Sequence, residues 1–254
     1  RTCYTIHNLA YQGNYPRIDY AFTNLPPSYL HSNGAEFFGW FSLLKTGIAF
    51  ADILTTVSPR YAIEITTPRL GCGLDGALRA RKDSLIGVLN GVDYEEWNTE
   101  HNKYLKHPFS VRSLAGKDAE KTSLQQELRL PVRADVPLFA CITRLASQKG
   151  IELLLGALME MLASDIQFAL LGTGQPVFEQ AFRRLAERYP DKTSVHIAFD
   201  QGLSHRIEAG ADFFLMPSSF EPCGLNQMYS LRYGTIPIVR TTGGLDDTVT
   251  DIAE

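Results

Sequence analysis

The feature that most constrains this sequence is a regular alternation of short apolar runs and longer amphipathic segments from about residue 118 onward. Strands of about five residues that alternate with helices are typical of a parallel sheet covered by helices on both faces. The sequence therefore predicts an α/β fold of the doubly wound type. Strands are expected at 137–143, 166–171, 194–199, 212–216 and 236–240, and helices at 118–130, 148–163, 176–189, 203–210, 224–234 and 244–253.

The first 90 residues are less regular. Strands are expected at 2–6, 53–57 and 85–89, and helices at 42–50 and 59–66. Ser58 followed by Pro59 is a typical start for the second of these helices. The stretch between 7 and 41 is rich in proline and aromatic residues and is expected to form loops. Residues 94–117 have little periodicity and are expected to connect the two regions.

Composition and charge exclude several classes of function. The net charge of −4 gives no reason to expect nucleic acid or an anionic membrane as a partner, and no apolar run has the length of a membrane span. The four cysteines are scattered, without metal-ligand spacing, so reduced thiols are expected. The chain starts at Arg1 rather than Met, and we expect it to be an internal piece of a longer protein.

Polar turns follow most of the predicted strands, and right-handed crossovers place such turns on one edge of a sheet. The turn after 212–216 carries Glu221, with Cys223 and Gly224 after it. The helix that follows offers backbone N–H groups to phosphate. Cys223 is expected to be a small packed residue, because no base that could activate it lies nearby in the sequence. This turn could hold a hydroxylated group and a phosphate, as a sugar-nucleotide requires.

Two further turns are candidates for binding a nucleotide diphosphate. Arg144 and Lys149, five residues apart, could approach a diphosphate from two sides, although both residue types are also common in solvated turns. Gly172 and Gly174 suit either a close approach of the backbone to a nucleotide or simply a tight turn. Val177 stands where a G-x-G-x-x-G motif has its third glycine, so a nicotinamide enzyme is not favoured.

Other candidates also have two interpretations each. Phe199 at the end of a predicted strand could face a base or belong to the core. Thr242 and Gly243 could bind an anion or cap the last helix. His7 after the first strand could donate to a bound sugar, although a lone histidine is usually structural, and Asn90 could have a similar role or simply form its turn.

Several segments, in the same order along the whole chain, make the sequence resemble the bacterial glycogen synthase and starch synthase family. They are Thr5–Gly13 (TIHNLAYQG), Ala51–Pro59 (ADILTTVSP), Val88–Asp93 (VLNGVD), Thr143–Gly150 (TRLASQKG), Ser204–Ile207 (SHRI), Phe220–Leu225 (FEPCGL) and Tyr233–Thr235 (YGT). The resemblance implies a GT-B architecture of two Rossmann-like domains, 1–86 on the glucan acceptor side and 87–254 on the nucleotide-sugar side, both truncated.

The resemblance also implies an activity, which is retaining transfer of glucose from ADP-glucose to the non-reducing end of an α-1,4-glucan, without a cofactor or essential metal. It implies a catalytic set of Glu221, His7, Arg144 and Lys149. The substrate-binding residues that it implies are Asn8, Asn90, Gly172, Gly174, Phe199, Cys223, Gly224, Leu225, Asn226, Thr242 and Gly243. The expected compartment is the bacterial cytoplasm, or a plastid for a plant starch synthase.

The resemblance leaves two alternatives, which are a related transferase that uses UDP-glucose and a nucleotide- or glucan-binding relative without turnover. In many retaining transferases of this fold a second glutamate follows the first by eight residues, and here that position is Tyr229. Ser219 stands where a basic residue is common. The family's N-terminal K-x-G-G-L loop and its C-terminal helix are absent from the chain, so we expect the chain alone to be inactive.

Overall fold

The computed structural model describes residues 1–253 and divides them into two compact units. The first unit comprises Arg1–Asn90 together with two short later segments, Glu221–Cys223 and Thr242–Asp247. The second unit comprises Gly91–Phe220, Gly224–Thr241 and the residues from Thr248 onward. The predicted domains, 1–86 and 87–254, assign both short segments to the second domain, whereas the structure groups them with the first unit. Each unit contains a parallel sheet with helices, which confirms the predicted α/β class.

The first unit is built on a three-stranded parallel sheet in the order β1 (Cys3–Ile6), β5 (Ile53–Thr56) and β6 (Leu85–Gly87). Its helices are α1 (Leu43–Phe50), α2 (Pro59–Glu64) and α3 (Asp75–Ala80). The predicted helix start at Ser58 is confirmed, because its hydroxyl accepts a hydrogen bond from the Tyr61 N–H at 3.0 Å. The α3 helix was not predicted.

A small antiparallel sheet of β2 (Asn14–Pro16), β4 (Trp40–Ser42) and β3 (Glu36–Phe37) lies within the stretch expected to be loops. The expectation was wrong because each strand has only two or three residues, too few for a period-2 pattern to be visible. Tyr20, Ala35 and Phe41 form a separate small core beside this sheet.

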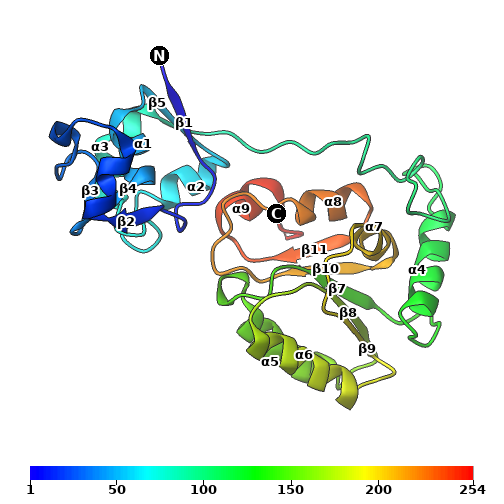
Figure 1. Ribbon diagram of the computed structural model, residues 1–254. Coiled ribbons are helices and arrows are strands. Elements are labelled where there is room, and N and C mark those ends of the chain that lie inside the picture. The colour runs from blue at the N-terminus through cyan, green and yellow to red at the C-terminus, as the bar shows by residue number, and fades with distance from the viewer. Residues whose placement is uncertain (254) are drawn as a thin grey trace. The chain divides into compact units, whose positions relative to one another are not determined.

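The second unit has a five-stranded parallel sheet in the order β11-β10-β7-β8-β9 (Figure 1). Its strands are β7 (Leu138–Ile142), β8 (Gln167–Leu171), β9 (Thr193–His196), β10 (Phe213–Met216) and β11 (Ile236–Val239). Its helices are α4 (Ala115–Glu127), α5 (Ile151–Met161), α6 (Pro176–Arg188), α7 (Gln201–Gly210) and α8 (Asn226–Arg232). The short helix α9 (Gly243–Thr248) belongs to the first unit except for its last residue. Every strand predicted after residue 118 is present.

Side chains that alternate along the central strands separate two hydrophobic cores. Phe168 and Leu170 of β8 pack with α5 and α6, whereas Ala169 and Leu171 pack with α4 and α7. Figure 1 shows α5 and α6 side by side on one face of the sheet. Both faces are therefore covered, as the near-continuous apolar strands predicted.

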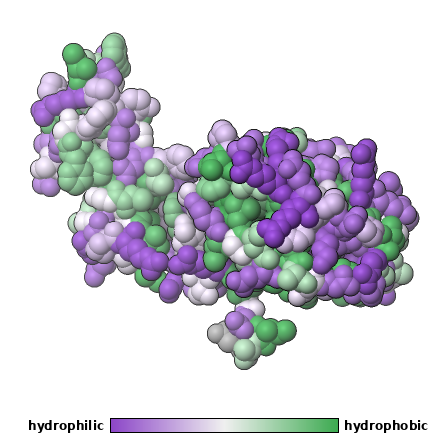
Figure 2. All heavy atoms as spheres, turned by 90° about the horizontal axis from the view of Figure 1, so that it is seen from below, coloured by the Kyte–Doolittle hydropathy of each residue, from purple (hydrophilic) through white to green (hydrophobic). Residues whose placement is uncertain are grey.

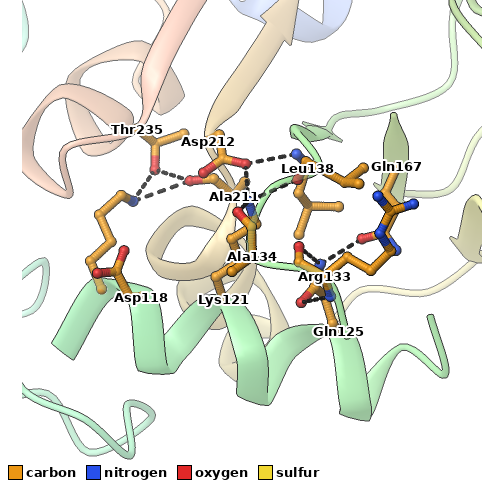
Figure 3. A network of polar contacts seen from close by, with 12 residues as sticks. Asp118, Lys121, Gln125, Arg133, Ala134, Leu138, Gln167, Ala211, Asp212 and Thr235 are labelled. Atoms are coloured by element: carbon orange, nitrogen blue, oxygen red, sulfur yellow. Dashed lines mark hydrogen bonds and ion pairs between the residues drawn. The ribbon is translucent and has the colours of Figure 1, made fainter. Parts of the chain in front are cut away.

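An ion pair and hydrogen bonds connect α4 to the sheet (Figure 3). Lys121 Nζ lies 2.7 Å from Asp212 Oδ2, and the same carboxylate oxygen accepts from the Leu138 N–H at 2.7 Å. Gln125 donates to Gln167 Oε1 at 2.7 Å, with both residues buried. These contacts satisfy polar groups at the amino ends of β7, β8 and β10, the edge opposite the predicted site.

The face drawn in Figure 2 is mostly hydrophilic, with hydrophobic residues interspersed among polar ones. Within residues 1–253, no helix combines the length and the apolar character needed to cross a membrane.

Candidate active site

The order of the strands in the second unit creates a switch point between β7 and β10. The chain leaves β7 for α5 on one face of the sheet, and it leaves β10 for α8, which packs against α7 on the other face. Two neighbouring strands whose helices diverge leave a crevice at their carboxyl ends, where α/β proteins bind ligands. The predicted Arg144–Lys149 turn and the predicted 216–225 turn flank this point.

A cavity of about 740 Å³ lies at this edge, within the second unit. Its volume is in the range of small-molecule sites. Its lining residues come mainly from the turns after four strands, from α8 and from the connecting segment. They include Glu96, Trp97, Thr143, Arg144, Lys149, Gly172, Thr173, Phe199, Asp200, Gln201, Pro217, Ser218, Asn226 and Tyr229. The structure therefore brings together five residues predicted from the sequence, namely Arg144, Lys149, Gly172, Phe199 and Asn226.

The two cations reach the cavity from opposite ends of one turn. Arg144 follows β7 and is exposed, whereas Lys149 is half-buried and closes a 3₁₀ turn directly before α5. The Ser219 N–H and hydroxyl both donate to the Gln148 carbonyl oxygen, at 2.8 and 3.0 Å, and Gln148 Nε2 donates to the Phe220 carbonyl oxygen at 2.5 Å. The turns that follow β7 and β10 are thereby fixed to each other beside the cavity.

The two glycines of the β8 turn permit close packing of backbone against backbone. A Cβ on Gly172 would overlap the Thr143 carbonyl oxygen, and one on Gly174 would overlap the carbonyl oxygen of Leu145. Leu145 donates to the Thr173 carbonyl oxygen at 2.8 Å and accepts from the Gln175 N–H at 2.8 Å. The tight-turn interpretation therefore accounts for both glycines, and Gly172 also lines the cavity.

Phe199 does not end a strand, because β9 stops at His196. Its side chain is 95% exposed and lines the cavity, so it is not a core residue. Of the interpretations that the sequence left open, an aromatic face available to a base is the one that agrees with this position.

Several predicted residues belong to the first unit. His7, directly after β1, is exposed, and the side-chain oxygen of Asn8 accepts from the Ala10 N–H at 3.0 Å. Glu221 is buried, with 6% of its surface exposed. Burial raises the pKa of the neighbouring Tyr61 to about 12, and the negative charge of Glu221 contributes to this rise. Cys223 is buried, and burial raises its pKa, which agrees with the expectation of a packed residue rather than a nucleophile.

The predicted anion site at Thr242 and Gly243 is already occupied by a carboxylate of the chain. Both carboxylate oxygens of Glu64 lie 3.1 Å from the Gly243 N, and the Thr242 hydroxyl donates to the same group at 3.2 Å. These groups bind the carboxylate of Glu64, so a phosphate would have to displace it.

Three other predicted residues lie at the edges of these arrangements. Asn90 belongs to the first unit, and its backbone makes a hydrogen bond to the Cys223 thiol. Gly224 has a φ of 74°, and Leu225 precedes the first residue of α8. Among residues 1–253, the cavity lining includes Asn226 but neither Gly224 nor Leu225.

Sequence reasoning missed an aromatic wall of the cavity. The Trp97 ring stacks on the Tyr229 ring, with centroids 3.6 Å apart and an interplanar angle of 6°. It also stacks on the His205 ring, with a centroid distance of 4.0 Å and an interplanar angle of 18°. His205 is fully buried, and burial lowers the pKa of its ring. A tryptophan in an otherwise polar connecting segment was the one signal available, since the chain has only two.

No group of three or more His, Cys, Asp or Glu side chains suited to a metal ion occurs in the described part of the chain, residues 1–253. The titratable side chains at the cavity include the cations Arg144 and Lys149 and the carboxyl groups of Glu96, Asp200 and Glu208. A positive end beside the β7 turn is suited to a phosphate-bearing ligand.

Comparisons with known proteins identify the family of the chain. The family described as "Starch synthase catalytic domain" matches residues 1–80, and the family described as "Glycosyl transferases group 1" matches residues 125–253. The glycogen synthase of Anaeromyxobacter sp. strain Fw109-5 is 56% identical over 251 residues, 99% of this chain and 53% of that relative. The glycogen synthase of Cellvibrio japonicus is 53% identical over 98% of this chain and 52% of its own length.

A solved structure is also similar over nearly the whole chain. The catalytic domain of starch synthase IV from Arabidopsis thaliana, bound to ADP and acarbose, has a TM-score of 0.94 and 37% identity, covering 99% of this chain and 53% of that one. The predicted GT-B fold and the predicted resemblance are thus confirmed, and the chain spans about half the length of the curated relatives it matches. Because the second of these family models covers just over half of the chain, the chain belongs to the glycosyl transferases group 1 family.

Proposed function

We propose that the protein to which this chain belongs is a glycogen or starch synthase. It transfers glucose from ADP-glucose to the non-reducing 4-hydroxyl of an α-1,4-glucan and retains the anomeric configuration. The observation that carries the proposal is the cavity at the β7–β10 switch point with Arg144 and Lys149 on its wall. The names of the relatives, which are 53–56% identical over nearly the whole chain, support the same activity.

The two cations act on the leaving group. When the bond between the anomeric carbon and the β-phosphate oxygen breaks, negative charge develops on the diphosphate. Arg144 provides a planar fork of donors and Lys149 a compact charge, and such preorganised charges stabilise the transition state more than the ground state. Their turn is fixed by the hydrogen bonds between Gln148 and Ser219, so little reorganisation is needed during the reaction.

The residues of the first unit act on the glucose. Glu221 accepts hydrogen bonds from glucose hydroxyls, and His7 donates to the 6-hydroxyl, with its backbone carbonyl near the anomeric centre. The acceptor 4-hydroxyl attacks from the side that the diphosphate leaves, and its proton passes to the departing phosphate oxygen. One C–O bond forms and one breaks, and no enzyme nucleophile, cofactor or metal takes part.

The donor is proposed to be ADP-glucose. The related starch synthase IV structure holds ADP, and Phe199 offers an exposed aromatic face at the cavity to a base. Tyr229 stacks on Trp97 at the position where many retaining transferases of this fold have a second glutamate. The proposed compartment is the bacterial cytoplasm, where ADP-glucose and glycogen would be present together.

The test is transfer of labelled glucose to glycogen by the full-length protein, offered ADP-glucose or UDP-glucose, with and without EDTA. Arg144→Ala is expected to lower kcat by about 10²–10³-fold, as for loss of one transition-state donor, and Glu221→Ala is expected to abolish transfer. Glu160→Ala, on the exposed face of α5, is the control. A preference for UDP-glucose, or binding of ADP without any transfer, would support one of the two alternatives instead.

A further inference from the structure

A buried carboxyl group lies beneath the candidate nucleotide cavity. Glu208 of α7 has no exposed surface, yet it is among the residues that line the cavity. Its Oε1 atom has no hydrogen-bond partner within residues 1–253, and its Oε2 atom contacts the hydroxyl of Ser230 on α8. An ionised carboxylate in such a place would leave one charged oxygen buried without a donor, which is costly.

The two contacts of Ser230 Oγ need one more hydrogen than its hydroxyl supplies. Its Oγ is 2.7 Å from Glu208 Oε2 and 2.8 Å from the carbonyl oxygen of Asn226. The carbonyl can only accept, and an ionised carboxylate can also only accept, but a hydroxyl has a single hydrogen to donate. Both contacts are satisfied if Glu208 is protonated, because its O–H then donates to Ser230 and Ser230 donates to Asn226.

A separate hydrogen bond, from the side chain of Asn226, reaches the strand that precedes the cations. The Asn226 side-chain nitrogen donates to the carbonyl oxygen of Ile142, the last residue of β7, at 2.9 Å. Asn226 itself lines the cavity, as do Thr143 and Arg144, which directly follow Ile142. A proton on Glu208 would therefore complete a connection from α7 through α8 to the end of β7.

The surroundings of Glu208 favour the neutral acid. Burial raises its pKa to about 8, and the Ser230 hydrogen bond and the Lys117 charge only partly oppose this effect. The titratable groups that face it are Lys117 of α4, Cys141 of β7, and Tyr229 and Tyr233 from α8 and its end. Lys117 is the one cation among them, and its Nζ is held by two carbonyl oxygens and the Thr235 hydroxyl rather than by a carboxylate.

We propose that Glu208 is a neutral carboxylic acid whose proton positions Asn226 and the end of β7 for an anionic nucleotide, which makes Glu208 a positioning residue of the cavity. The identity of the ligand rests on the proposed function. When Glu208 ionises, two effects follow. The Glu208 carboxylate and the Asn226 carbonyl oxygen then compete for the single hydrogen of the Ser230 hydroxyl. A negative charge also appears beneath a cavity that must hold a diphosphate.

The experiment measures the affinity of the chain for ADP by calorimetry between pH 7.5 and 9.5, where the terminal phosphate no longer titrates. If only the neutral acid binds, the Kd of the wild-type protein rises roughly 25-fold over this range, as a single group with a pKa near 8 requires. In Glu208→Gln the amide N–H₂ replaces the acid proton as donor to Ser230 at every pH. This variant is expected to bind ADP with little dependence on pH.

Two controls separate this role from a general structural one. Glu160→Gln, an exposed change on α5, is expected to keep the pH dependence of the wild type. Ser230→Ala is expected to weaken ADP binding at pH 7.5, because the link to Asn226 is broken. If the loss of affinity at high pH persisted in Glu208→Gln, another group would be responsible and the proposal would be overturned.

A second measurement needs no ligand. The infrared difference spectrum between pH 7 and 9.5 is expected to lose the C=O stretching band of a protonated carboxylic acid in the wild type and to show no such change in Glu208→Gln. Absence of ADP binding at every pH would contradict the proposed function, whereas absence of this band would overturn the role of Glu208 by itself. The two failures are therefore distinguishable.

Discussion

Glu208 and Glu160 are the same residue type in two environments of one domain. Glu160 lies on the exposed side of α5, and Glu208 lies wholly inside, under the cavity. A sequence pattern could place Glu208 on a helix, but not beneath a ligand site. Its contact with Ser230 joins residues 22 positions apart and depends on how α7 and α8 pack. The position of Arg144 and Lys149 in a turn at the sheet edge was predictable, because this turn directly follows an apolar strand.

The raised pKa of Glu208 predicts a dependence of stability on pH. From its ordinary value of 4.5 up to about 8, the folded protein holds a proton that the unfolded chain has lost. The free energy of unfolding therefore falls as pH rises through this window, by at most about 1.4 kcal/mol per pH unit, and is unaffected by this group above pH 8. Urea titrations at pH 5, 6.5 and 8 should show a shallower fall in Glu208→Gln than in the wild type.

Glu160→Gln provides the comparison for that series, because an exposed carboxylate contributes no such difference. Equal slopes in the wild type and in Glu208→Gln would mean that Glu208 is ionised in the folded protein at neutral pH.

At the scale of elements, the strands and helices of the second unit were predictable and the small antiparallel sheet was not. Long apolar runs that alternate with helices carry a strong periodic signal, whereas β2, β3 and β4 are formed by pairing between residues up to 28 positions apart. The end of β9 was placed three residues too late, since Phe199 continues the apolar pattern although it lies outside the sheet.

Two glycines of the second unit should respond in opposite directions to the same change. Gly172→Ala places a methyl group against the Thr143 carbonyl oxygen, so a loss of about 1–3 kcal/mol in unfolding free energy is expected. A Cβ at Gly156 in α5 would meet no group within 4 Å outside the helix's own backbone, so Gly156→Ala should raise the unfolding free energy by up to about 1 kcal/mol through helix propensity. Thermal and urea unfolding of both variants would measure the difference; a stable Gly172→Ala protein would show that the turn can relax.

The whole molecule contains separate hydrophobic cores. One surrounds Ile6, Leu54 and Tyr61 in the first unit, and two others lie on the faces of the second sheet. The chain also passes between the units more than once, because Glu221–Cys223 and Thr242–Asp247 belong to the first. Sequence reasoning placed a single boundary, since a short segment that returns to another unit leaves no trace in local periodicity.

Separate cores predict that heat unfolding departs from a single two-state transition. If the cavity binds ADP, ligand at 100 times its Kd should stabilise the second unit by about 2.7 kcal/mol and raise its transition temperature. The first unit's transition should move less. Differential scanning calorimetry with and without ADP would test this, and Arg144→Ala should reduce the shift. One transition that moves as a whole would mean that the two units unfold together.

The stacking of Trp97 on Tyr229 has an optical consequence. The other tryptophan, Trp40, is half exposed in the first unit, whereas the indole of Trp97 lies on the wall of the cavity between two aromatic rings. Any molecule that enters the cavity changes the polarity and the quenching around this one indole. The protein thus carries its own fluorophore at the place where its ligand would bind, so occupancy can be followed by emission without a label.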